Sequence, residues 1–319
     1  MDKFFPEISV VVPTYNNEKY IIQCLESIRH DKPNRIELIV IDDGSTDDSI
    51  KLIQNWISKN SLFFFNVIFK SQQNKGITKT LNRLVELSTC DYVAILAGDD
   101  CLLPGGLDAR INALKENISW LGVFGDCEVI DENNHRIFES GIELLYPKRV
   151  SARKVALLSP QSITLELILR WSIPGPVFMA KRIAYSEEFG VGKYNERLKT
   201  EDRDFYLRLI AKKALGFINT KVAAYRIHDS STVNILTSKK TVQESVIESE
   251  KLNLMNFTGL NRLALYSVMQ YRVGVILLKH SSNTTKRIAG IFLAMIFYMI
   301  KKVVDLYQSI IILLVKQRN

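Results

Sequence analysis

Apolar runs and helical repeats alternate along the first 130 residues of this chain. Short apolar runs bounded by turn residues predict buried strands, and apolar residues recurring every three or four positions predict helices. The predicted strands are 7–13, 36–42, 63–70, 92–97 and 120–130, and the predicted helices are 18–30, 45–59, 76–88 and a segment starting at Leu107. This alternation predicts an α/β fold whose mostly parallel sheet has helices on both faces.

The pattern is irregular between 131 and 175, where we expect a covering segment. The further elements that the sequence predicts are two short helices, a longer helix and a strand, at 151–158, 161–170, 200–214 and 221–228. Beyond residue 240 the pattern is helical and basic. We therefore expect an α/β domain at 1–240 and a helical tail at 241–319.

The positive charge of the chain is concentrated in this tail. The net charge is +8, yet residues 251–319 hold ten Lys and Arg against one acid, and the preceding residues hold 32 basic against 33 acidic side chains. The tail's longest uncharged apolar run is 288–300, shorter than the ~20 residues of a spanning helix. Helices lying flat bury an apolar face and keep lysines at the headgroups.

These features predict peripheral attachment to an anionic membrane surface, on the cytoplasmic inner face of the cell membrane. The basic residues flank apolar helices instead of alternating with stacking aromatics, so we expect no nucleic-acid partner. Packing of the tail on the body, or a homo-oligomer, stays open. The four cysteines form no CxxC pair and the N-terminus lacks the features of a signal peptide, which favours a cytoplasmic setting.

Two pairs of adjacent carboxylates follow predicted strands. Asp42 and Asp43 end "IELIVIDD", and Asp99 and Asp100 end "YVAILAGDD". The carboxyl ends of parallel strands meet at one edge of a sheet, so the pairs are expected to converge. Adjacent carboxylates repel unless a cation or donors compensate, and oxygen ligands suit Mg2+ or Mn2+ bound to a diphosphate. Either pair alone is also compatible with a plain turn or helix cap.

Six segments together resemble one known family. "ISVVVPTYNNEKYIIQCLESI", "IELIVIDDGSTDDS", "NKGITKTLN", "YVAILAGDD", "TEDRDFYLR" and "YRIHDSST" occur in the order found in family 2 glycosyltransferases of the GT-A fold. The similarity covers about residues 7–232. It implies a Rossmann-like GT-A domain and metal-dependent, inverting transfer of a sugar from a nucleoside diphosphate sugar, with UDP expected as the nucleotide.

The resemblance also implies roles for residues on the donor side. Asp100 and His228 would hold Mn2+ or Mg2+, while Asp42 would hold its turn. Asp43 would accept a hydrogen bond from the base, and Asp99 would meet the ribose or the diphosphate. The residues expected to bind the nucleotide are Pro13, Tyr15, Glu18, Asp43, Lys75 and Asp99. For Arg226, contact with phosphate and pairing with a nearby acid are both open.

On the acceptor side, the resemblance makes Asp202 the general base, which takes the proton of the attacking hydroxyl. Glu201 and Gly175 are expected near a glycan or lipid-linked acceptor, whose contacts should come from about 140–200. Two departures from the family pattern affect the donor side. Ala97 stands where many members have an acid, and Thr80–Leu81–Asn82 stand where many have "ARN".

The function expected from these features is a step in cell-surface polysaccharide synthesis, such as O-antigen or capsule. A sugar nucleotidyltransferase would need a Gly-rich loop with Arg and Lys near its N-terminus, which this chain lacks. An aspartyl-phosphate protein would not explain "TEDRDFYLR" or "YRIH". The remaining alternative is a non-catalytic, membrane-bound partner subunit with a GT-A fold, against which the retained Asp43, Asp100, Asp202 and His228 argue.

Overall fold

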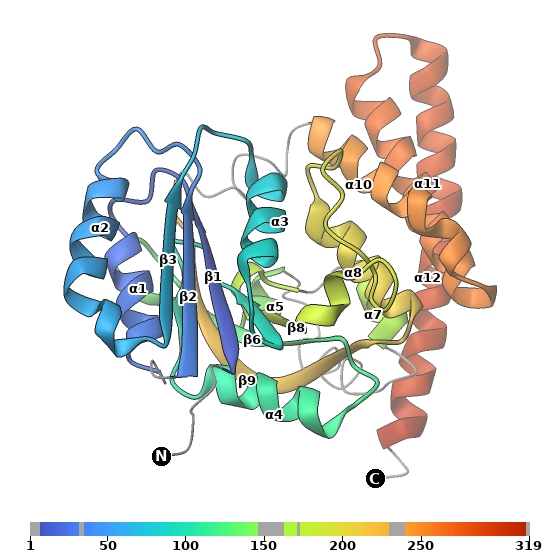
Figure 1. Ribbon diagram of the computed structural model, residues 1–319. Helices are drawn as coiled ribbons and strands as arrows, with labels where there is room; N and C mark the ends of the chain where they lie inside the picture. The colour runs from blue at the N-terminus through green and yellow to red at the C-terminus, as the bar shows by residue number, and fades with distance from the viewer. Residues whose placement is uncertain (1–6, 32–34, 146–162, 171–172, 230–239, 317–319) are drawn as a thin grey trace. The chain divides into compact units, whose positions relative to one another are not determined.

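The computed structural model describes residues 7–31, 35–145, 163–170, 173–229 and 240–316 (Figure 1). The chain divides into two compact units. The first is formed by Met1–Lys148, Ile173–Tyr194 and Leu215–His228, and the second by Arg149–Ser172, Asn195–Ala214 and Asp229–Asn319. Both units thus contain residues that precede position 240, and the functional division predicted at that position stays a prediction.

The first unit contains a mixed sheet, which has nine strands among the described residues. Its first part has the order β3-β2-β1-β4, and all its neighbouring strands are parallel. These strands are β1 (Ile8–Thr14), β2 (Ile36–Asp42), β3 (Asn66–Ser71) and β4 (Tyr92–Ile95). Every residue of β1 and β2 is buried, as expected for central strands covered on both faces. The strands predicted from these apolar runs are confirmed.

The second part of the sheet introduces antiparallel pairs. Strand β8 (Phe178–Lys181) lies antiparallel between β4 and β6 (Gly122–Ile130), and β6 runs parallel to the long, curved β9 (Leu215–Arg226; Figure 1). The short strands β5 (Cys101–Leu102) and β7 (Arg136–Phe138) pair with β9 and β6. Strand β9 begins at Leu215, six residues before the predicted start at 221. The sequence did not predict this first part, because exposed polar residues in the middle of the strand interrupt its apolar pattern.

Helices cover both faces of this sheet. Helix α1 (Ile21–Arg29) buries an apolar stripe at helical spacing and shares a core with every second residue of β1. Helices α2 (Ser49–Asn60) and α4 (Gly106–Glu116) complete that core, whereas α3 (Ile77–Leu87) packs on β1 and β2 from the opposite face (Figure 1). A short helix, α5 (Gly141–Leu145), follows β7 and packs on β6.

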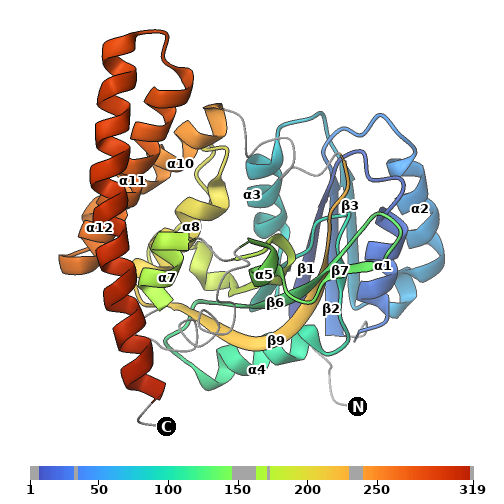
Figure 2. The same cartoon turned by 180° about the vertical axis from the view of Figure 1, so that it is seen from behind.

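The second unit is helical in its described part. It consists of α7 (Ile163–Arg170), α8 (Glu201–Ala211), α10 (Lys240–Asn253), α11 (Gly259–His280) and α12 (Thr284–Lys316; Figure 2). The predicted helices at 161–170 and 200–214 and the helical pattern beyond 240 are confirmed; the helix predicted at 151–158 lies outside the described residues. Among those described, no helix combines the length and the apolar character that a membrane crossing requires.

Buried charges connect the long helices of this unit. Glu166 of α7 is 1% exposed and accepts hydrogen bonds from Arg170 at 2.5 Å and from the amide of Gln308 on α12 at 3.0 Å. Arg170 in turn contacts Asp305 at 2.6 Å. Helices α11 and α12 form an antiparallel hairpin that two glycines allow to close tightly, since a Cβ on Gly274 would lie 2.6 Å from the backbone nitrogen of Ala294.

Candidate active site

Both carboxylate pairs lie beside the carboxyl end of β1. Thr14 is in register with Asp42 of β2, and the backbone N–H of Asp43 donates to the carbonyl of Thr14 at 2.9 Å. On the other side, the N–H of Gly98, next to Asp99, donates to the carbonyl of Pro13 at 3.1 Å. The expected convergence of the two pairs at one edge of the sheet is therefore confirmed.

The first pair shapes two loops. Asp42 accepts hydrogen bonds from the backbone N–H groups of Gly44 and Ser45 at 3.1 and 2.9 Å, which confirms that it holds the turn. Asp43 is 5% exposed, and its two oxygens accept the N–H groups of Lys75 and Gly76, each at 2.9 Å. The carboxylate of Asp43 thus fixes the loop that carries Lys75, whose side chain is exposed at the same edge.

The loop after β1 is fastened to the start of α2. Asn16 has a positive φ of 52°, a conformation that Asn tolerates better than most residues, and its side-chain oxygen accepts the N–H of Thr46 at 2.8 Å. Glu18 accepts the N–H of Asp48 at 3.0 Å. These bonds leave Tyr15, which is 49% exposed, at the surface of the edge above the buried Pro13.

The second pair separates into an accessible and a buried carboxylate. Asp99 lies 3.1 Å from Nε2 of His228, through its Oδ2, and its side chain keeps 24% exposure. The His228 ring packs against the ring of Tyr20, with 4.9 Å between their centroids. A carboxylate and an imidazole, drawn from chain positions 129 residues apart, therefore face each other at the edge of the sheet.

Asp100, by contrast, is 2% exposed and accepts the backbone N–H of Arg226 at 2.9 Å. Burial, followed by the neighbouring charge of Asp99, raises the pKa of Asp100 well above its usual range. The buried environment favours the neutral form of Asp100.

The guanidinium of Arg226 links the segments that surround this pair. Its Nε donates to the carbonyl of Asp99 at 2.8 Å, and its Nη1 donates to the carbonyl of Asp131 at 2.8 Å and to Asn134 at 2.7 Å. Its Nη2 donates to Gln23 of α1 at 2.8 Å. The donors of the Arg226 side chain thus hold backbone and amide oxygens of these segments, and its contact with phosphate stays a prediction.

Asp99 and His228 are the two side chains at this edge that would suit a divalent cation. No group of three His, Cys, Asp or Glu side chains among them is arranged to hold a metal ion. The 3.1 Å contact between Oδ2 of Asp99 and Nε2 of His228 is a hydrogen bond, so both side chains would exchange that bond for the ion when a metal binds. The remaining positions on Mn2+ or Mg2+ are ones that water and a diphosphate can fill.

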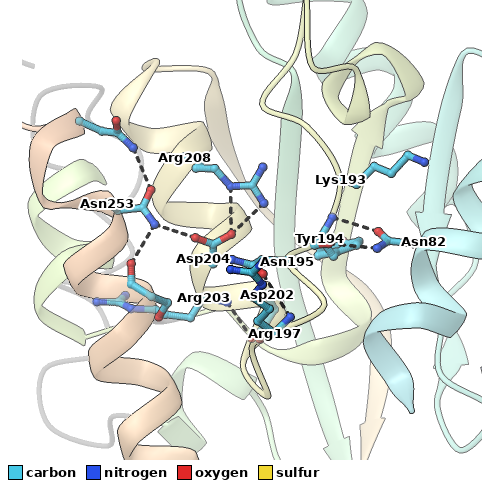
Figure 3. A network of polar contacts seen from close by, with 12 residues as sticks. Asn82, Lys193, Tyr194, Asn195, Arg197, Asp202, Arg203, Asp204, Arg208 and Asn253 are labelled. Atoms are coloured by element: carbon cyan, nitrogen blue, oxygen red, sulfur yellow. Dashed lines mark hydrogen bonds and ion pairs between the residues drawn. The ribbon is translucent and has the colours of Figure 1, made fainter. Parts of the chain in front are cut away.

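Asp202 belongs to the second unit, on the first turn of α8 (Figure 3). Burial raises the pKa of its carboxyl to about 6, while the N–H of Arg203, which donates to Asp202 at 2.7 Å, and the positive charge of Arg203 oppose the rise. A carboxyl with such a pKa matches the requirement for a general base near neutral pH. Glu201, beside it, is 8% exposed. Gly175 lies in the first unit, as the exposed first residue of a 3₁₀ turn before β8 whose other two residues are buried.

Sequence reasoning missed some of the residues that build the site. It left the role of Arg226 open and did not consider Tyr20 or Gln72, whose amide donates to Asp43 at 2.7 Å. Asn82, noted as a departure from "ARN", uses its side-chain amide to bind both backbone groups of Tyr194, each at 3.0 Å (Figure 3). The one available signal was position: Gln72 follows the predicted strand 63–70 by two residues, and Tyr20 lies near the start of the predicted helix 18–30.

Comparison with known proteins agrees with this architecture. A family model described as "Glycosyl transferase family 2" matches residues 9–161. The chain is similar to the putative glycosyltransferase EpsH of Bacillus subtilis, with 33% identity over 72% of this chain and 63% of that protein. It is 25% identical to the GalNAc(5)-diNAcBac-PP-undecaprenol beta-1,3-glucosyltransferase of Campylobacter jejuni, over 73% of this chain and 69% of that protein. Similarity to the chondroitin synthase of Escherichia coli, at 32% identity, covers 42% of this chain but spans only 19% of that longer protein.

Solved structures show the same fold. TarS of S. aureus, residues 1–349 in complex with UDP-GlcNAc, superposes with a TM-score of 0.63 at 17% identity, over 89% of this chain and 79% of that one. The mannosyltransferase PcManGT of Pyrobaculum calidifontis, in complex with GDP-Man and Mn2+, gives a TM-score of 0.59 at 14% identity, over 97% and 87%. The fold is therefore that of the GT-A glycosyltransferases. The family model over residues 9–161 and the named glycosyltransferase relatives identify a glycosyltransferase family 2 domain in this chain.

The contacts of Arg226 predict a specific stability effect. Replacing Arg226 by Met removes a buried guanidinium that donates to four oxygens, and hydrogen bonds of this kind contribute ~0.5–1.5 kcal/mol each. We expect the free energy of unfolding to fall by ~3 kcal/mol or more, measured by urea denaturation. Arg136→Met, which removes a half-exposed arginine from the same sheet, is the control and should change stability little. Equal stability of the two variants would contradict the role given to Arg226.

Proposed function

We propose that this protein transfers a glycosyl residue from a nucleoside diphosphate sugar to a hydroxyl group of an acceptor, with inversion at the anomeric carbon. The observation that carries the proposal is the facing pair of Asp99 and His228, at a sheet edge whose loops are fixed by Asp42 and Asp43. The glycosyltransferase family 2 domain supports the reaction class.

The donor is expected to carry UDP. Support comes from TarS, which shares the fold and is solved with UDP-GlcNAc. The exposed ring of Tyr15 suits stacking on a base, and the exposed Lys75 suits a phosphate group. Asp43 is buried and already bonded to two backbone N–H groups, so its contact with the base would use lone pairs that those bonds leave.

Asp99 and His228 are the residues that would hold Mn2+ or Mg2+. When bound, the ion supplies positive charge for the leaving diphosphate. Asp100 was the ligand expected from the resemblance, but its burial and its bond to the N–H of Arg226 favour a positioning role. The neighbour PcManGT, solved with Mn2+, supports the use of a metal by this fold.

Asp202 is the proposed general base. It would accept the proton of the acceptor hydroxyl while that oxygen forms a bond to the anomeric carbon and the bond from that carbon to the diphosphate breaks. Glu201 and Gly175 are proposed to contact the acceptor. The Campylobacter jejuni relative, whose name specifies an undecaprenol-linked substrate, supports a lipid-linked glycan as acceptor and a place in cell-surface polysaccharide synthesis.

A lipid-linked acceptor agrees with a surface of α12 suited to membranes. Apolar side chains follow one another every three or four residues along this helix, and each is about half exposed or more. This outer stripe consists of Phe292, Met295, Ile296, Met299, Val303, Leu306 and Ile310. Lys302 is exposed on the same helix, and Lys286 and Arg287 at its start. We propose that the stripe enters the headgroup region of an anionic bilayer on the cytoplasmic face.

The two candidate metal ligands make separable predictions. Asp99→Asn should reduce UDP binding in Mn2+ to the level found with EDTA, because a ligand to the ion is lost. Asp100→Asn should keep the metal-dependent part of UDP binding. The amide oxygen can still accept the N–H of Arg226, and the site already favours a neutral group. Calorimetry with UDP and Mn2+, and electron paramagnetic resonance of bound Mn2+, measure both. The reverse pattern would assign the metal to Asp100.

The proposed base predicts a rate effect and a pH profile. Asp202→Asn should lower kcat by ~10²–10⁴ and leave the affinity for UDP within a few fold. A base with a pKa of about 6 is ionised above that pH and protonated below it, so kcat/KM should fall as the pH drops through about 6. Nucleotide release from UDP-sugars across pH tests this. Loss of UDP binding in the variant would show that Asp202 acts on the donor instead.

Membrane attachment through the outer stripe predicts binding that depends on anionic lipid. The full chain should sediment with vesicles containing phosphatidylglycerol, less so at high salt, and not with phosphatidylcholine alone. The double variant Phe292→Asp, Met299→Asp should stay in solution, whereas Ile118→Asp, at an exposed apolar residue of the first unit, should bind normally. A variant that still sediments, or that only converts a dimer to a monomer, would refute the attachment.

A further inference from the structure

A buried ion pair lies one residue from the proposed base. Arg203, on the first turn of α8, is among the largest fully buried side chains of the chain, and Glu250 on α10 is 0% exposed. We propose that Arg203 and Glu250 together position Asp202 for acceptor deprotonation, so that α10 and α11 are part of the catalytic machinery. The proposal rests on the role of Asp202 given above and adds two positioning residues to it.

The guanidinium of Arg203 fixes the start of α8 against the end of α7. Its Nη1 donates to the carbonyl of Leu167 at 2.6 Å, and its Nη2 donates to the carbonyl of Ile168 at 2.9 Å. Both carbonyls lie in the last turn of α7, where backbone oxygens have no partner within the helix. Arg203 therefore caps one helix while its own backbone N–H, at 2.7 Å, holds the carboxylate of Asp202.

Glu250 completes the arrangement from the tail. Its Oε1 accepts Nη2 of Arg203 at 3.0 Å and Nε of Arg272 on α11 at 3.3 Å. Its Oε2 is buried and has no hydrogen-bond partner among the described residues. One carboxylate thus lies between two guanidinium groups, and the three side chains join four helices at the position of the proposed base.

Stability alone gives a weak reason for this arrangement. Desolvation of buried charges offsets most of their attraction, and apolar residues of similar volume often serve stability as well or better. A function for the pair is its effect on Asp202. The positive charge of Arg203 counteracts the rise in the pKa of Asp202 that burial causes. Because Glu250 lies 3.0 Å from Arg203, we expect its negative charge to weaken that effect.

The other charges on helices packed against α8 are paired elsewhere. Asp204 contacts Arg208 at 2.9 Å, within α8. On α7, Glu166 and Arg170 pair with each other, at 2.5 Å. On α10, the exposed acids Glu244 and Glu248 face lysines of their own helix, and Glu201 shares the first turn of α8 with Asp202. Arg203 and Glu250 are therefore the buried ion pair next to Asp202, and Glu201 is a further buried charge of the same turn.

The direction in which the acid limb of kcat/KM moves distinguishes a positioning role of the pair from a purely structural one. Glu250→Gln leaves Arg203 uncompensated, so the acid limb of kcat/KM should move to lower pH by about half a unit. Arg203→Met removes the positive charge, so the limb should move to higher pH. In both variants kcat should fall ~10-fold while the affinity for UDP stays unchanged, because the base and not the donor site is displaced.

The experiment uses the full chain and follows UDP release from a UDP-sugar in Mn2+ across pH, with UDP affinity and thermal stability measured in parallel. Glu166→Gln is the matched control, because it removes a buried charge of the same unit that pairs with Arg170 and Gln308. This control should lose stability and keep the wild-type pH profile. If Glu250→Gln and Glu166→Gln behave alike in kcat and pH profile, the pair is only structural and the proposal is overturned.

A double variant covers the case in which a single one does not fold. Arg203→Met with Glu250→Met replaces the pair by apolar side chains and leaves neither of the two charges buried alone. A folded double variant with the wild-type kcat and acid limb would overturn the proposal; a raised acid limb supports it. Full activity of Asp202→Asn would instead refute the proposed base, and that outcome is separate from any result on Arg203 and Glu250.

Discussion

The candidate site depends on one buried guanidinium, that of Arg226. This side chain comes from the last residue of β9 and donates to the loop after β4, to the turn between β6 and β7 and to α1. One side chain thereby connects segments from four distant parts of the chain through its hydrogen bonds. A planar group with five donors can do this, whereas an ammonium group offers a single point of attachment.

Arg226 also explains why the two neighbouring carboxylates differ. Its backbone N–H binds Asp100 and its side chain holds the carbonyl of Asp99, so the turn presents Asp99 outward and buries Asp100. Two charges on adjacent residues would repel each other. The raised pKa of Asp100 reduces that repulsion, because burial favours the neutral form of its carboxyl.

The sequence predicts the parts of the fold that have a clear period. Strands β1 and β2 and helix α1 follow from unbroken apolar runs and from a helical stripe, and the convergence of Asp43 with Asp99 follows from parallel strand order. Strand β8 could not be predicted from the sequence, since four residues are too few to show a period. The first part of β9 was also missed, because Asn219 and Thr220 interrupt its apolar pattern. Whether Asp99 or Asp100 is accessible depends on a contact from residue 226, which local sequence does not encode.

The alternation of the chain between two units has a consequence for its synthesis. Strand β4 ends at residue 95, yet the strand that pairs with its outer edge, β8, is synthesised only at 178–181. Strand β6 likewise lacks its partner β9 until residue 226 has been synthesised. A growing chain therefore carries an unpaired apolar strand edge through much of translation, and such edges promote association between chains. The ribosome-bound chain, more than the folded protein, is therefore the form in which this strand edge is open to other chains.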